Sequence, residues 1–263
     1  MQRLAPLVAL ALTIAGPVHA AGIVAGRVDG ARLTLEGDDA PNAIVVTSGA
    51  AEDEILVLGD DGTAVVGLPG GTGAGIRRIV VHMGDGSDRV DLRQLRVRGA
   101  VVVRLDRGDD ALVTEQARVH RLDVRAGHGV DTVFVGRQTR VAQRLSVRTG
   151  NDGDAVTIES AVVSALSVST GRGGDILRLF DTAVVRGTRV FTGNDQDTVT
   201  FELSEFFRDV DLNLGDADDL LILDTVIFYS DSDLDGGSDD DVLVFDGPVG
   251  FDEDPRVDFE FGG

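Results

Sequence analysis

Apolar and polar residues alternate along most of this chain, and the same pattern returns about every 22 residues. Within each repeat, apolar residues stand two positions apart on a background rich in Val, which is typical of β-strands that bury one face. A fixed period of this length indicates a repeat architecture rather than a domain with one closed core. Eight successive repeats begin at Gly84, Asp106, Gly127, Gly150, Gly171, Gly193, Gly215 and Gly237.

Apolar residues occupy the same positions in successive repeats, three before the lead residue and six and eight after it. A looser apolar column lies about thirteen positions after the lead residue, at Val97, Val119, Val141, Val163, Val184, Phe206 and Phe228. Each repeat therefore predicts about three short strands. The repeats lack a 3.6-residue stripe, which argues against helices. Because one small coil cannot bury its inner face alone, we expect an all-β chain, folded as a single-stranded parallel β-helix, or β-solenoid.

The pattern divides the chain into four parts. Residues 1–20 resemble a secretory signal peptide, with Arg3 before a short apolar run and a cleavage position after Ala20. Residues 21–75 are an N-terminal cap with irregular first coils, 76–245 the parallel β-helix of eight repeats, and 246–263 a C-terminal cap. No segment approaches the length of a transmembrane helix. We expect a secreted protein, periplasmic or extracellular.

The N-terminal cap carries its own turn signals. Arg32–Leu35 and Ala43–Val46 predict strands joined by a turn. Segments 54–58 and 63–66 flank Gly59-Asp60-Asp61-Gly62, and this arrangement predicts a β-hairpin.

The charge is strongly negative, with 45 acidic residues against 24 basic ones, all of them Arg, and a net charge of −21. This balance argues against nucleic acid and anionic membranes as partners, since both need basic surfaces. The segment from Ser204 onward holds 19 acidic residues and two Arg, so cations are expected to screen or bind it. The chain has no Cys, so disulfides do not hold the fold.

One Asp recurs four positions after the lead residue in all eight repeats, within a Gly-rich turn that suits positive φ. The segments Gly127–Val133 and Gly171–Leu177 resemble the G-x-G-x-D-x-(apolar) core of the RTX, or haemolysin-type, calcium-binding repeat. The resemblance covers about residues 79 to 245. It implies that stacked turns bind Ca²⁺ through Asp carboxylates and Gly carbonyls. The family's unit is nine residues, however, whereas this chain has one such turn per coil.

A calcium site would therefore be built along one column of turns, from the Asp of one coil, the Asp or Gly of the next coil, and water. We expect such sites chiefly from the fourth coil onward. The candidate metal ligands are Asp88, Asp110, Asp131, Asp152, Asp154, Asp175, Asp195, Asp197, Asp219, Asp239 and Asp241.

The alternative is that these Asp side chains bind backbone amides and serve only the turn. In the first coils, Arg104, Arg125 and Arg148 share a strand column beside the turns and are expected to neutralise the carboxylates. That column later becomes Phe191, Asn213 and Asp235.

Other polar residues give weaker signals. His82, His120 and His128 share no repeat position, which argues against a histidine metal site. The repeated Thr149, Thr170 and Thr192 predict an inward ladder of hydroxyl groups. The chain contains no Ser-His-Asp order, HExxH or phosphate-binding loop.

We therefore expect a secreted, non-enzymatic calcium-binding repeat protein with a structural or adhesive role and a surface partner, either extracellular polysaccharide or protein. Two alternatives remain open. One is a polysaccharide lyase or hydrolase, whose groove could be lined by arginines between Arg77 and Arg148, although Trp is absent and Tyr229 stands alone. The other is a metal-free structural solenoid.

Overall fold

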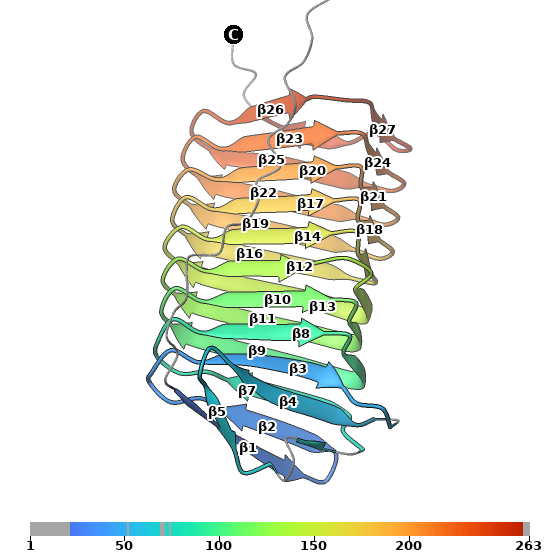
Figure 1. Cartoon of the computed structure of the whole chain (residues 1–263). Helices are drawn as coiled ribbons and strands as arrows, with labels where there is room; N and C mark the ends of the chain where they lie inside the picture. Colours follow the sequence, from blue (N-terminus) through green and yellow to red (C-terminus); the bar gives the residue numbers. More distant parts are fainter. Residues whose placement is uncertain (1–21, 52, 69–71, 74, 260–263) are drawn as a thin grey trace, which may run out of the picture.

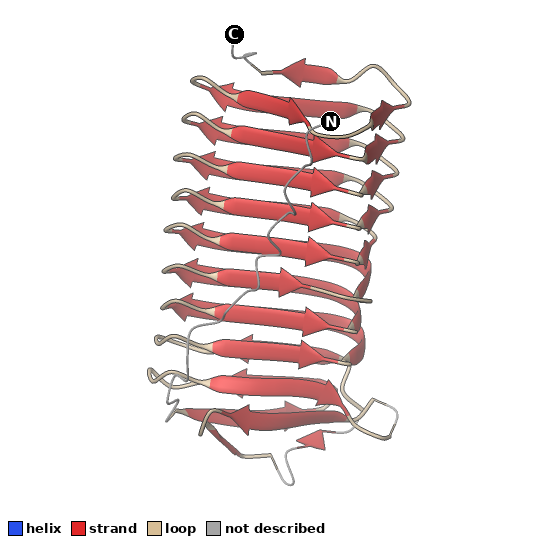
Figure 2. Ribbon diagram, turned by 45° about the horizontal axis from the view of Figure 1, so that its top comes forward, coloured by secondary structure: helices blue, strands red, loops and turns tan. Residues whose placement is uncertain are grey.

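The computed structural model describes residues 22–51, 53–68, 72–73 and 75–259, so the predicted signal peptide lies outside the described residues. The described chain contains strands and no helix, and its coils are stacked along one axis (Figure 1, Figure 2). This confirms the predicted parallel β-solenoid and its 22-residue period. Because it lacks helices, the described part also has no helix that could cross a membrane.

Two parallel ladders form the broad walls of the solenoid. The first ladder follows the Gly-rich turns and contains β3 (Ala43–Ser48), β8 (Arg89–Arg93), β10 (Ala111–Glu115), β12 (Thr132–Val135), β14 (Ala155–Glu159), β17 (Ile176–Phe180), β20 (Thr198–Glu202), β23 (Leu220–Asp224) and β26 (Val242–Phe245). The second precedes the turns and contains β7 (Arg78–His82), β9 (Arg96–Arg107), β11 (Arg118–His128), β13 (Arg140–Asn151), β16 (Leu166–Arg172), β19 (Thr188–Asn194), β22 (Val210–Asp216) and β25 (Ser232–Ser238).

A narrow third wall connects the two broad walls. In the later coils it consists of short parallel strands, β15 (Val162–Val163), β18 (Ala183–Val184), β21 (Glu205–Phe206), β24 (Val226–Phe228) and β27 (Val249–Phe251). In the earlier coils the first residues of β9, β11 and β13 take this place, and a register shift after Val119 separates them from the broad wall. We call the outer surface of this wall the third face. The predicted three strands per coil are thus separate in later coils and merged in earlier ones.

The predicted apolar columns form the core between the walls. The column six positions after the lead residue is 0–8% exposed from Val90 to Leu243. In the C-terminal half, aromatic rings fill the interior, and the Phe206 and Phe228 rings stack with centroids 5.2 Å apart. Each strand contributes alternate side chains to this core, as the pattern of apolar residues two apart requires.

The N-terminal region closes one end of the stack with antiparallel pairs. β1 (Ile23–Asp29) pairs with β2 (Arg32–Glu36), and β3 pairs with β4 (Ile55–Asp60), which also contacts β6 (Thr72–Gly73). The hairpin predicted around residues 59–62 is wrong. β5 (Ala64–Val66) instead pairs in parallel with β1, because the intervening turn is a corner that carries the chain to the other broad wall.

The C-terminal segment continues the solenoid before the described residues end. β27 and β28 (Arg256–Asp258) pair in parallel with β24 and β25, so they add a partial coil in register. Phe259 follows and is 8% exposed. Part of the predicted C-terminal cap is therefore built from the same pattern as the repeats.

Candidate functional site

The repeated Asp residues form a buried column at the corner after each Gly-rich turn. All eight are 0–3% exposed, namely Asp88, Asp110, Asp131, Asp154, Asp175, Asp197, Asp219 and Asp241. In the first seven, the backbone N–H donates to Oδ1 of the Asp one coil further on, over 2.7–2.9 Å from the Asp88–Asp110 pair to the Asp219–Asp241 pair. Asn42 N–H donates to Asp88 in the same way. The aspartate column therefore joins coils through side-chain to backbone bonds.

Burial raises the pKa of these carboxyl groups above the usual value of 3.8. Desolvation is the main cause that raises the pKa, to about 7 for Asp88, Asp131 and Asp197, and to about 8 for Asp110. The bond from the neighbouring amide opposes this shift, whereas nearby carboxylates add to it. In seven of the eight residues, Asp88 to Asp219, the second oxygen, Oδ2, is buried and has no hydrogen-bond partner. Burial in the column thus favours the protonated form of these carboxyl groups.

A second ladder lies beside the carboxyl groups. The hydroxyls of Thr149, Thr170 and Thr192 are buried and donate to the carbonyl oxygens of Thr170, Thr192 and Leu214, respectively. This confirms the predicted inward hydroxyl ladder.

The remaining candidate ligands, Asp152, Asp195 and Asp239, lie on the exposed side of the turns. Their Oδ2 atoms accept bonds from the backbone N–H of Gly129, Gly173 and Ala217 in the preceding coils. The eleven predicted ligands are therefore divided between a buried and an exposed column.

Calcium takes six to eight oxygen ligands. The buried column leaves one unpartnered carboxyl oxygen per coil in seven coils. Across the described chain, no three His, Cys, Asp or Glu side chains lie together in an arrangement that could hold a metal ion. These residues do not form a calcium cage by themselves, and calcium binding stays a prediction.

The predicted arginine column exists but does not face the aspartate column. Arg104, Arg125 and Arg148 stack in register, and the column continues to Phe191 and Asp235 as expected. These arginine side chains point outward, whereas the carboxyl groups of the aspartate column point inward. The expectation that they neutralise that column is therefore wrong.

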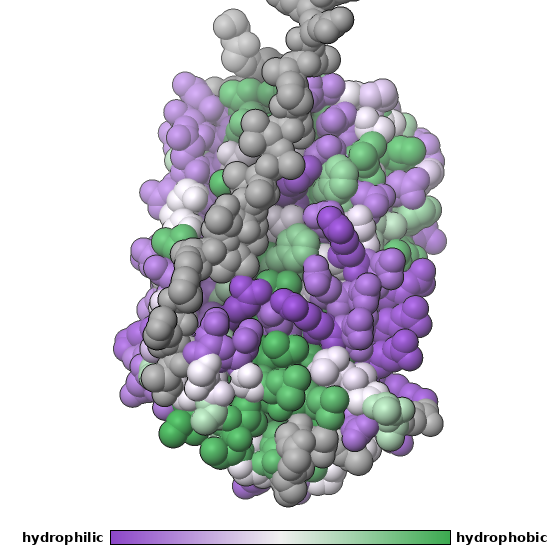
Figure 3. Space-filling view, viewed as in Figure 1, coloured by the Kyte–Doolittle hydropathy of each residue, from purple (hydrophilic) through white to green (hydrophobic). Residues whose placement is uncertain are grey.

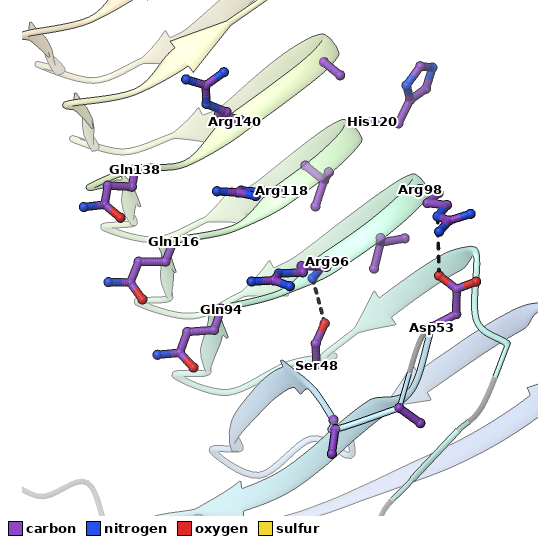
Figure 4. A pocket seen from close by; sticks show the side chains of 16 residues that line it. Ser48, Asp53, Gln94, Arg96, Arg98, Gln116, Arg118, His120, Gln138 and Arg140 are labelled. Carbon is purple, nitrogen blue, oxygen red and sulfur yellow. Dashed lines mark hydrogen bonds and ion pairs between the residues drawn. The ribbon is translucent and has the colours of Figure 1, made fainter.

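The third face carries a groove of about 1200 Å³ over the first three complete coils. Its lining forms parallel columns, drawn side by side in Figure 4. One column holds Gln94, Gln116 and Gln138, the next holds Arg96, Arg118 and Arg140, and Arg98 and His120 lie beyond them. We call this the arginine–glutamine groove.

The three glutamines lie at a corner of the coil. The fold requires the backbone conformation of this corner but not a glutamine side chain. Gln94, Gln116 and Gln138 have φ of 50°, 55° and 61°, values that non-glycine residues rarely adopt. The corresponding corner residues of later coils, Ser160, Asp181, Leu203 and Thr225, share this conformation. The corner therefore accepts very different side chains. The fold does not require the three successive glutamines, which are a property of this part of the surface.

The arginine column is likewise independent of the fold. Arg96, Arg118 and Arg140 align in register, and the same position holds Val162 and Ala183 in the next two coils. Among the described residues the three exposed guanidinium groups form no ion pair. Arg98 at the groove margin differs, since its Nε lies 3.9 Å from Asp53 Oδ1. Stacked like charges repel one another, so the column favours an anionic partner.

The sequence also holds a signal for the position of this groove. Arg96, Arg118 and Arg140 each directly precede a residue of the looser apolar column, namely Val97, Val119 and Val141. In a strand, the neighbour of a buried residue faces outward. Gln94, Gln116 and Gln138 each stand two positions before one of these arginines, so the recurring Gln-x-Arg-Val can be read in the sequence.

Comparisons with known proteins add no relative. No family model, no curated protein and no solved structure matches this chain. The resemblance to the RTX repeat therefore rests on the turn sequence alone.

Proposed function

We propose that this protein is a non-enzymatic binding protein of the cell exterior, and that its arginine–glutamine groove binds an anionic polymer. The observation that carries this proposal is the column of Arg96, Arg118 and Arg140, whose guanidinium groups have no ion pair among the described residues. Guanidinium groups match carboxylates and sulfates in charge and geometry. The neighbouring glutamine amides can donate to, and accept from, neutral polar groups of the same ligand.

The negative net charge is expected to restrict the binding of an anionic polymer to this groove. A chain with a net charge of −21 repels polyanions elsewhere on its surface. Binding is therefore expected to be local, to weaken as salt screens the contacts, and to depend on the three arginines together.

Binding is tested by titrating the mature protein with polygalacturonate, using neutral dextran as the control polymer. The triple variant Arg96→Ala, Arg118→Ala, Arg140→Ala is expected to bind about 10- to 100-fold more weakly, since each exposed ion pair contributes about 0.5–1 kcal/mol. Arg189→Ala is the matched control, because Arg189 is an exposed arginine on a broad wall whose Nε lies 2.9 Å from Asp211 Oδ2. Unchanged affinity of the triple variant would contradict the proposal.

The same titration separates binding from catalysis. A binding protein leaves the polymer length unchanged, whereas a lyase releases unsaturated products that absorb ultraviolet light. Time-dependent product release that the triple variant lacks would replace the non-enzymatic proposal with the lyase alternative.

Calcium is a second candidate ligand, at the exposed acidic edge of the turns. The carboxylates of Asp239 and Asp240 lie here one coil beyond those of Asp216 and Asp218. Their mutual repulsion would be relieved by a divalent cation, with water completing the oxygen ligands.

A further inference from the structure

We infer that the ligand of the groove is an acidic polysaccharide that runs along the third face, parallel to the solenoid axis, from the arginine column to an aromatic platform formed by Phe207 and Tyr229. This inference rests on the proposed function and extends it beyond the groove.

The platform lies on the same face as the groove. The third-face position of Arg140 continues through Val162, Ala183 and Glu205 in successive parallel pairs. Phe207 follows two residues after Glu205, as Arg98 follows Arg96. Backbone bonds from Phe207 N–H to Val184 O and from Tyr229 N–H to Phe206 O keep successive coils in this register.

The two rings stack on the outside of the solenoid. Their centroids are 4.8 Å apart and their planes differ by 17°. Phe207 is 39% exposed and Tyr229 37% exposed, and the adjacent Val185 is 47% exposed. The core has its own aromatic stack, in Phe206 and Phe228, so packing does not require the outer rings. Tyr229 therefore does not stand alone, as its single occurrence in the sequence suggested.

Hydrophobic residues gather over the third-face strands β18, β21 and β24 in Figure 3, and hydrophilic residues lie over the coils below them. Exposed aromatic faces pack against the apolar faces of sugar rings, while the tyrosine hydroxyl stays at a polar edge. Here the Tyr229 hydroxyl lies 3.5 Å from Glu205 Oε1. An acidic polysaccharide combines the two kinds of group that this face offers to bind, namely anionic groups and ring faces.

The distances suit one extended chain. Three coil steps separate Arg140 from Glu205, which is about 14 Å at a strand spacing of ~4.8 Å. The residues that continue the columns of Arg96 and Arg98 between them are small or aliphatic, namely Val162, Ser164, Ala183 and Val185. A sugar residue advances a polysaccharide by a length similar to one coil, so successive residues can meet successive coils.

The test compares oligogalacturonates of two lengths, one that fits within the groove and one long enough to reach Tyr229. The double variant Phe207→Ala, Tyr229→Ala is expected to bind the long oligomer about 10-fold more weakly and the short one unchanged. Phe191→Ala is the control, because Phe191 is 46% exposed on a broad wall away from this face. Circular dichroism confirms that each variant is folded.

Each outcome separates the two proposals. If the double variant binds the long oligomer like the wild type, the path along the third face is wrong while the groove stands. If the triple arginine variant also binds normally, the groove itself is wrong.

Two further probes examine the ligand class and the path. Polyglutamate of matched charge is expected to gain nothing from the aromatic rings, and equal dependence on them would overturn a polysaccharide ligand. Glu205→Gln removes a carboxylate from the path and is expected to strengthen binding of the long oligomer only. An unchanged affinity for the long oligomer would contradict the path.

Discussion

At the residue scale, the repeated Asp is chiefly a hydrogen-bond acceptor for the backbone of the adjacent coil. Asp131 is fully buried and its Oδ1 accepts the Asp110 N–H over 2.9 Å. The sequence shows that an Asp is required at this turn. It does not show whether the carboxylate faces a metal or an amide, because both uses need the same residue in the same turn.

Asp131→Ala is expected to lower the free energy of unfolding by about 1–3 kcal/mol, because it leaves a buried N–H without an acceptor. Asp131→Asn retains an acceptor and is expected to cost less. Urea unfolding measures both, with Asp39→Ala as the control, because Asp39 is an exposed Asp in a turn outside the column. If Asp131→Ala unfolds at the same urea concentration as the wild type, the bond contributes nothing to stability.

The raised pKa values of the aspartate column predict that stability falls as pH rises. The folded-state pKa values of Asp88, Asp110 and Asp131 are about 7 to 8, above the ordinary 3.8 of an unfolded chain. Folding therefore favours the protonated form, and this contribution is complete below pH 3.8 and lost as pH rises through about 7 to 8. Melting temperatures at pH 5, 7 and 9, chosen to bracket this window, should decrease in that order. A rise between pH 5 and 9 would refute this reading of the column.

At the element scale, the Gly-rich turns fix where each coil closes. Gly150 has φ of 123°, and a Cβ there would collide with the carbonyl oxygen of Gly127 in the coil before it. The repeated glycine was predicted from the sequence through its need for positive φ. The close approach to a neighbouring coil is an additional restriction that only the stacked structure shows.

Gly150→Ala is therefore expected to destabilise the protein by about 1–3 kcal/mol through strained backbone geometry, with the collision adding to this. Gly187→Ala is the matched control, since a Cβ at Gly187 would lie 3.8 Å from the carbonyl oxygen of Asp209, an ordinary van der Waals contact. Thermal unfolding distinguishes them, and equal melting temperatures of the two variants would show that the turn tolerates a side chain.

The repeat period and its apolar columns predicted the solenoid because stacked coils must bury equivalent residues at equivalent positions. The same reasoning failed for the hairpin around residues 59–62, since a turn sequence does not reveal whether the chain returns along the same wall or crosses to the other. It offered a groove lined by arginines between Arg77 and Arg148 but did not identify which residues line it. Outward residues obey no burial rule, and Gln138 lies one position later in its repeat than Gln94 and Gln116.

At the scale of the whole molecule, charge is distributed unevenly along the axis. The exposed arginine column lies in the first complete coils, whereas the segment from Ser204 onward holds 19 acidic residues and two Arg. A cation that binds only the folded, stacked turns would stabilise the molecule by mass action. The proposed calcium sites and the proposed polyanion groove thus occupy opposite ends.

If calcium binds the exposed acidic edge, EDTA will lower the melting temperature and millimolar Ca²⁺ will restore it. Asp239→Ala is expected to reduce the response, because it removes an exposed carboxylate from that edge. Asp53→Ala, near the groove, serves as the control. A melt that is identical with EDTA and with Ca²⁺ would exclude calcium as a stabilising ligand.

The aspartate column also has a direction. Each carboxyl group accepts a bond from the coil before it, so the Asp110 amide acquires its acceptor only when the coil of Asp131 is in place. In each such pair, the later coil supplies the carboxyl acceptor and the earlier coil supplies the amide donor. The two ends of the column therefore differ: the backbone amide of Asn42 donates to Asp88 at the N-terminal end, and Asp241, the last acceptor, leaves its own amide for whatever follows at the other end.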